Sequence, residues 1–118
     1  MREASSVDLH GILAPSSGAG AIWTLTGSRD LNANLVRFPA GEGVGEHVNE
    51  EADVLVVGVA GAGSVAVDGR TYPLHSGTVV FVPKGTRRST RSESADFAYL
   101  TVHRRRGLLR ISGSDGDP

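Results

Sequence analysis

The chain has 118 residues, 16 of them glycine, no cysteine and a formal net charge of −1 at pH 7. This length suits one domain with its own hydrophobic core. The lack of cysteine excludes a disulfide framework, a zinc knuckle and a thiol nucleophile, and the near-neutral charge gives no global attraction to nucleic acid or to a membrane surface. Because no apolar run reaches the roughly 18 residues of a membrane span and the N-terminus has no signal-peptide pattern, we expect a cytoplasmic protein.

Short β-rich runs bounded by Gly, Pro, Asp and Ser follow one another along the chain, and no long stretch repeats apolar residues at helical spacing. We predict strands at residues 21–26, 32–38, 45–49, 53–60, 63–67, 70–74, 78–82, 86–90, 96–103 and 107–111. The continuous apolar runs at 54–57 and 79–82 predict that these two strands are covered on both faces. The pattern as a whole predicts an all-β sandwich or barrel.

Turn signals separate several of these strands. Asp68-Gly69 predicts a two-residue hairpin turn, because Asp-Gly readily adopts the positive φ angles that such a turn requires. Pro83-Lys84-Gly85 predicts a second tight turn. Small and polar residues dominate both ends of the chain, so we predict a flexible N-terminal segment over 1–20, a barrel over 21–111 and a disordered tail over 112–118.

The strand at 96–103 alternates apolar and polar residues. Its apolar positions Ala98, Leu100 and Val102 predict the face that packs on the core. Tyr99, Thr101 and His103 are then expected on the opposite face, with His103 outside any cavity.

Residues 41–53 form the first of two motifs with possible chemistry. Gly41 is followed after five residues by His47, and Asn49 lies two positions further along the same predicted strand. His47 and Asn49 therefore share a face. Asp53 comes at the end of the motif. A neutral imidazole is a good transition-metal ligand, whereas an amide carbonyl is a weak one.

Residues 77–88 form the second motif, in which Gly77, Pro83 and Gly85 are followed by Arg88. Glycine and proline set backbone turns, so these positions report the shape of the chain. Arg88 reports chemistry: a guanidinium is always cationic and has no lone pair to give to a metal.

In the order and spacing of these motifs, residues 32–103 resemble the cupins, single-domain jelly-roll β-barrels of the RmlC-like kind. The cupin motifs are roughly G-x5-H-x-H-x(3,4)-E-x6-G and G-x5-P-x-G-x2-H-x3-N. Here Asn49 replaces the second His, Asp53 or Val54 falls at the Glu, and Arg88 replaces the His of the second motif. The resemblance implies a cupin barrel whose metal ligands are mostly replaced. We therefore expect either no cofactor or a weakly bound divalent transition metal on His47, Asn49 and Asp53.

The leading functional prediction is a protein that holds a small anionic metabolite in the barrel. Arg88 would anchor the anion, because its planar fork binds carboxylates in a two-pronged manner. His47, Asn49 and Asp53 would supply polar contacts. We expect no nucleic-acid or membrane partner, and we expect a homodimer formed by strand exchange or sheet-face packing.

Three alternatives remain open on the sequence. One is a metal-dependent cupin enzyme of the dioxygenase or isomerase type with a reduced ligand set. Another is a metal-free enzyme with His47 as general base, oriented by Asp53. The third is an inert structural barrel closed by a salt bridge from Arg88 to Asp53 or Glu51.

Overall fold

The computed structural model describes residues 3–105. Its elements, in chain order, are α1 (Leu9–Leu13), β1 (Gly20–Thr24), β2 (Leu31–Arg37), β3 (Gly43–Val48), β4 (Val54–Ala60), β5 (Ala62–Val67), β6 (Arg70–His75), β7 (Val79–Val82), β8 (Arg87–Ser92) and β9 (Ala98–Arg104). Every strand predicted within this range is found, with ends that differ by two residues or fewer. The strand predicted at 107–111 and the tail predicted at 112–118 lie outside the described residues.

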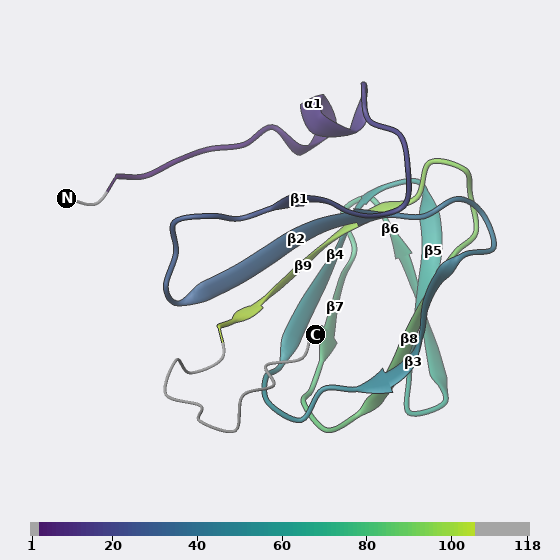
Figure 1. Ribbon diagram of the computed structural model, residues 1–118. Coiled ribbons are helices and arrows are strands. Elements are labelled where there is room, and N and C mark those ends of the chain that lie inside the picture. The colour runs from purple at the N-terminus through teal and green to yellow at the C-terminus, as the bar shows by residue number, and fades with distance from the viewer. Residues whose placement is uncertain (1–2, 106–118) are drawn as a thin grey trace.

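The strands form two antiparallel sheets that enclose a barrel. One sheet has the order β1-β2-β9-β4-β7 and the other the order β3-β8-β5-β6. In Figure 1 the two sheets face each other, and β1 and β2 extend from the barrel on one side. This arrangement confirms the predicted all-β jelly-roll barrel. Within residues 3–105, no helix has the length and apolar character needed to cross a membrane.

The predicted turns are present where local sequence demands them. Asp68 and Gly69 have φ angles of 48° and 83°, and they join Val67 directly to its partner Arg70. These two positive φ values match the mirror-image turns that favour Asp-Gly in hairpins. In the second turn Gly85 has a φ of 81°, and its N–H donates to the carbonyl of Asn49 at 2.7 Å. The turn before β8 is thereby tied to the end of β3.

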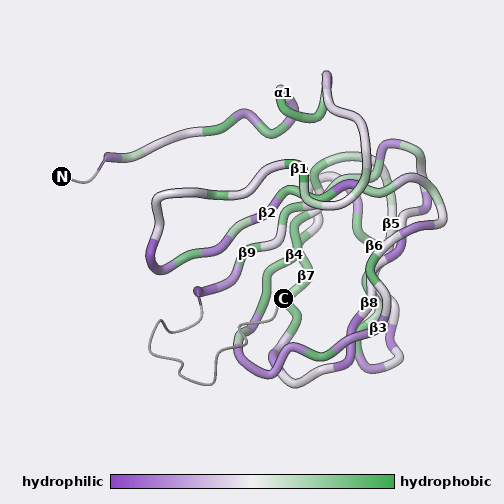
Figure 2. The backbone as a smooth tube through the Cα atoms, in the orientation of Figure 1, coloured by the Kyte–Doolittle hydropathy of each residue, from purple (hydrophilic) through white to green (hydrophobic). Residues whose placement is uncertain are grey.

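Most of the core lies between the two sheets. Its buried members are Val54, Val56, Val65, Leu74, Val80, Val82, Phe97 and Tyr99. A second, smaller cluster of Leu35, Val59 and Ala98 lies on the other face of the five-stranded sheet. The sheet is therefore apolar on both faces along part of its length. Figure 2 shows the corresponding run of hydrophobic residues along β4.

Helix α1 covers this second cluster and was not predicted. Its apolar residues Leu9, Ile12 and Leu13 pack against the cluster, and the Asp8 carboxylate caps the helix by accepting from the N–H of Gly11 at 3.1 Å. His10 also donates from Nε2 to the carbonyl of Val59 at 3.1 Å. Within the N-terminal segment predicted over 1–20, residues 9–13 are therefore helical. The helix has five residues, too few to show a helical period in the sequence.

The outer face of β4 and β7 is exposed beyond the reach of α1. Leu55 and Phe81 are paired across these strands and are 42% and 57% exposed, and Val79 is 57% exposed. The prediction that both strands are covered on both faces is therefore wrong for this face. A run of apolar residues does not by itself require that both faces of a strand are covered, because much of the surface of any folded protein is apolar.

Candidate functional site

The barrel contains a cavity of about 520 Å³ between the two sheets. Much of its wall is apolar and comes from both sheets: Val36, Phe38, Val44, Val54, Val56, Val65 and Val82. A volume of this size is typical of small-molecule sites, which combine an apolar wall with a few placed polar groups. The polar groups are therefore the part of the cavity that can select a ligand.

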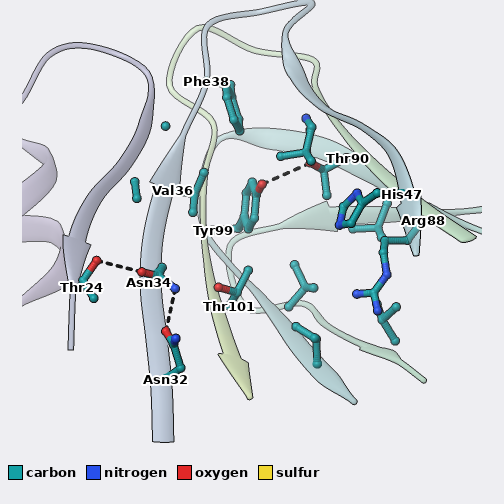
Figure 3. A pocket seen from close by; sticks show the side chains of 17 residues that line it. Thr24, Asn32, Asn34, Val36, Phe38, His47, Arg88, Thr90, Tyr99 and Thr101 are labelled. Atoms are coloured by element: carbon teal, nitrogen blue, oxygen red, sulfur yellow. Dashed lines mark hydrogen bonds between the residues drawn. The ribbon is translucent and has the colours of Figure 1, made fainter. Parts of the chain in front are cut away.

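A β-bulge in β3 brings His47 into the cavity. Val44 pairs with Thr90 and His47 pairs with Arg88, so three steps along β3 match two steps along β8. In a regular strand, residues three apart face opposite ways. The extra residue reverses this, and Val44 and His47 both line the cavity. His47 and Arg88 consequently lie side by side on its wall (Figure 3).

Arg88 is a buried cation that has no counter-charge among residues 3–105. It is 6% exposed, and its Nε and Nη2 atoms are buried without a hydrogen-bond partner in that part of the chain. Burial lowers the pKa of the guanidinium from its ordinary value. The side chain nevertheless stays charged at neutral pH, because an arginine is not deprotonated in proteins. Within residues 3–105 no ion pair to Arg88 is formed, and no Asp or Glu lines the cavity. The salt bridge considered for Arg88 with Asp53 or Glu51 is therefore not formed.

His47 is oriented by the backbone of its own bulge. Its Nδ1 lies 2.9 Å from the carbonyl oxygen of Gly45. A carbonyl can only accept, so Nδ1 carries the proton of this bond, and a neutral ring keeps its lone pair on Nε2. The group that orients the imidazole is thus Gly45 rather than Asp53.

Asn49 and Asp53, the other two predicted site residues, do not line the cavity. β3 ends at Val48, so the alternation of faces that relates His47 to Asn49 ends there. The Asn49 Oδ1 accepts from the backbone N–H groups of Glu51 and Ala52 at 2.9 and 3.3 Å. This is an Asx turn, which commits the amide oxygen to the backbone.

Asp53 also forms a hydrogen bond with the backbone rather than facing the cavity. It is exposed, and its Oδ1 accepts from the N–H of Lys84 at 2.9 Å. The next residue, Val54, points into the cavity instead. The strand therefore offers an aliphatic side chain where the cupin motif has its glutamate.

The donor set does not fit the divalent metal that the cupin resemblance implies. The lining residues include one imidazole and no carboxylate or thiolate, and the imidazole pairs across the strands with a cation. Within residues 3–105 there is no group of three His, Cys, Asp or Glu side chains that could hold a metal ion. Asn and Thr oxygens are weak partners for a transition metal beside an arginine.

Sequence reasoning missed the polar groups on β9. Tyr99 and Thr101 face the cavity, whereas Ala98 and Leu100 face the cluster under α1, so the assignment of the two faces was wrong. Because the sheet is covered on both faces here, apolar alternation could not show which face is the barrel interior.

Tyr99 on β9 is a buried phenol that faces β8, the strand of Arg88, from the opposite sheet. Its hydroxyl lies 3.1 Å from the Thr90 hydroxyl, and both residues line the cavity (Figure 3). Burial raises the pKa of Tyr99, and the hydrogen bond with Thr90 opposes this in part. Tyr99 is thus kept as a neutral hydrogen-bonding group.

The fold and the site define a small β-barrel protein with a cavity between its sheets and, in the cavity wall, an arginine that no carboxylate among residues 3–105 compensates. Residues 34–103 match the family model described as "Cupin domain". The chain therefore belongs to the cupin domain family, as its two motifs indicated. Among curated proteins, none matches the chain.

Several solved structures share the fold. KdgF from Halomonas sp. is 23% identical with a TM-score of 0.67, over 73% of this chain and 78% of that one. TT1209 from Thermus thermophilus is 24% identical with a TM-score of 0.70, over 86% and 98%. Salicylate 1,2-dioxygenase from Pseudoaminobacter salicylatoxidans, in adducts with gentisate, is 25% identical with a TM-score of 0.58, over 64% of this chain and 20% of that one.

Proposed function

We propose that this cupin binds a small organic anion inside its barrel, with Arg88 holding the negative charge. The observation that carries the proposal is the burial of Arg88 with no partner for Nε or Nη2 among the described residues. A buried charge is costly unless it is paired, so a site of this kind favours an anion that supplies the missing partner. A carboxylate can accept two N–H bonds from one guanidinium.

The size of the cavity favours an organic anion over an inorganic one. At roughly 30 Å³ per water molecule, 520 Å³ corresponds to about 17 waters. A phosphate or sulfate ion would leave most of the apolar wall uncovered, whereas an acid with a hydrocarbon body would contact it. The dioxygenase with gentisate offers a precedent within this fold for an aromatic acid.

His47 and Tyr99 complete the proposed anion site. His47 pairs with Arg88 across β3 and β8, and Tyr99 lines the same cavity. Neither residue adds a negative charge at neutral pH, so neither competes with the ligand for Arg88. The predicted contacts from Asn49 and Asp53 are not part of the proposal, because these residues do not line the cavity.

Matched acids and amides test this function. We would measure binding of carboxylic acids and their primary amides by thermal shift and calorimetry, for wild type, Arg88→Gln and Arg87→Gln. Removing one partner of a buried charge pair costs about 2–5 kcal/mol, so Arg88→Gln should weaken acid binding by about 30-fold or more. Arg87, whose side chain is 64% exposed, is the matched control and should bind as wild type. Equal affinity for acid and amide, or full affinity in Arg88→Gln, would overturn the proposal.

A metal-free enzyme is a second candidate, favoured by the orientation of His47. Its Nε2 keeps a lone pair beside the guanidinium that would hold a carboxylate. A bound acid could then lose a proton to His47 from a carbon near its carboxylate. Proton exchange of a bound acid in heavy water, followed by NMR, should stop in His47→Gln while binding persists. An acid that binds through Arg88 without exchange would count against this candidate.

The other expectations from the sequence remain predictions. A homodimer can be tested by measuring the native mass in solution. The cytoplasmic location and the absence of nucleic-acid and membrane partners are likewise open to direct test.

A further inference from the structure

The cavity has a second polar end that faces Arg88 from the opposite sheet. Thr24 on β1, Asn32 and Asn34 on β2, and Thr101 on β9 all line it. Figure 3 shows the three β1 and β2 side chains across the cavity from His47 and Arg88. None of these four residues carries a charge. The cavity is therefore cationic at one end and neutral but polar at the other.

A chain of hydrogen bonds leaves one donor free at this neutral end. The Thr24 hydroxyl donates to Asn34 Oδ1 at 2.8 Å, and Asn34 Nδ2 donates to Asn32 Oδ1 at 2.9 Å. The Asn32 amide nitrogen then has no acceptor among residues 3–105. The Thr101 hydroxyl likewise forms no hydrogen bond with the described residues. An amide N–H and a hydroxyl are thus available to a ligand.

An unpaired acceptor lies in register with this donor. His103 pairs with Asn32 across β9 and β2, and it lies two residues from Thr101, on the same face of the strand. Its Nδ1 lies 2.9 Å from the carbonyl of Arg104, so a neutral ring keeps its lone pair on Nε2. His103 is 5% exposed, and Nε2 is buried without a partner in the described part of the chain.

We propose that the ligand is a hydroxylated organic acid, with its carboxylate at Arg88 and a neutral hydroxyl at Asn32 and Thr101. This inference rests on the proposed function. A hydroxyl both donates and accepts, so it can accept from the Asn32 amide and exchange a hydrogen bond with the Thr101 hydroxyl; His103 lies behind these two residues and does not itself line the cavity. A second carboxylate would find no cation here, and an ammonium could not accept from Asn32.

The geometry also sets the order of groups in the ligand. Arg88 and Asn32 belong to opposite sheets and lie on opposite sides of the cavity (Figure 3). We therefore expect the carboxylate and the hydroxyl at opposite ends of the ligand. The valine side chains that line the same cavity favour a hydrocarbon body between the two groups.

Two matched pairs of acids test this inference. They are octanoate with its terminally hydroxylated form, and phenylpropanoate with its para-hydroxylated form. Calorimetry on wild type, Thr101→Val and Arg88→Gln would give the affinities. Thr101→Val removes a hydroxyl at nearly constant shape, and thermal unfolding of each variant checks that it folds. Asn32→Leu is a second variant at the same end of the cavity. A local distortion caused by one of the two substitutions would not be repeated by the other.

In wild type we expect the hydroxylated acid of at least one pair to bind about 2- to 10-fold more tightly than its parent. Thr101→Val and Asn32→Leu should each bring the ratio of the two affinities, hydroxylated acid to parent acid, to about 1. Arg88→Gln should weaken both members of the pair alike. If both acids bind through Arg88 with equal affinity, or if the hydroxyl preference survives both variants, this inference fails and the proposed function stands. If no acid binds wild type, both fail.

Discussion

Replacing Arg88 by methionine should stabilise the ligand-free protein while it removes anion binding. Arg88 is 6% exposed, and two of its guanidinium nitrogens are buried with no partner between residues 3 and 105. The unbound protein therefore bears the cost of desolvating this charge without the compensation of an ion pair. Methionine is unbranched and flexible, so it can occupy the same space along the cavity wall without a charge.

The size of the effect follows from the environment of Arg88. Burying an ion costs several kcal/mol in proteins, and exchanging buried charges for apolar residues stabilises by about 1–4 kcal/mol where it stabilises at all. Because solvent can enter a cavity of about 520 Å³, we expect the lower part of this range, about 1–2 kcal/mol. For a chain of 118 residues this corresponds to a rise in Tm of about 4–8 °C.

Urea unfolding and calorimetry of the ligand-free protein measure this effect. Arg87→Met is the matched control, because Arg87 is adjacent on β8 but its ion pair with Glu46, 3.4 Å long, is exposed. Its free energy of unfolding should change by less than about 1 kcal/mol. If Arg88→Met instead destabilises the free protein by more than the control does, the charge of Arg88 is compensated within the fold, and the argument for a waiting anion site is wrong.

Three further predictions concern other residues. Burial raises the pKa of Tyr99, so the phenol of the folded protein stays protonated to a higher pH than that of the unfolded chain. The stability that the buried neutral phenol contributes is present below about pH 10 and is lost as the pH rises through the folded pKa. Urea unfolding from pH 8 to 11 should therefore show a steeper alkaline loss of stability in wild type and Tyr72→Phe than in Tyr99→Phe; parallel curves would contradict this. Asp53→Ala removes the hydrogen bond from the Lys84 N–H and should lower the free energy of unfolding by about 1 kcal/mol, while the affinity for acids stays unchanged. If a folded Asp53→Ala variant loses acid binding, Asp53 contributes to the binding site. Elemental analysis of protein purified without a tag or chelator should find less than one metal per chain, equally in wild type and His47→Ala, and stoichiometric metal that His47→Ala removes would favour a metal enzyme.

The fold was predictable because its turns are encoded locally. The turns at Asp68-Gly69 and Gly85 need positive φ angles that these residues adopt readily. The spacing of such turns along the sequence therefore indicates where each strand begins and ends. Two glycine and proline frameworks in the right order were then sufficient to indicate the family. Helix α1 escaped prediction because five residues are stabilised by their contacts with the sheet rather than by their own pattern.

The site was only partly predictable, because strand register and burial are not local. Arg88 and His47 follow from motif spacing and do line the cavity. The choice between Asp53 and Val54 depends on a one-residue register that the motif leaves open, and such a shift exchanges the inner and outer faces of a strand. Tyr99 and Thr101 were assigned to the wrong face because both faces of β9 are covered.

The bulge in β3 has a consequence for the chemistry of the whole barrel. If the same sequence paired with β8 without a bulge, regular pairing from Val44 and Thr90 onward would bring Glu46 opposite Arg88 and turn His47 outward. The chain would then carry an internal counter-ion, and its own carboxylate would occupy the place of an acidic ligand. With the bulge, Glu46 lies outside and pairs with Arg87 instead. The local register of β3 thus separates a self-neutralised barrel from one that can accept an acid.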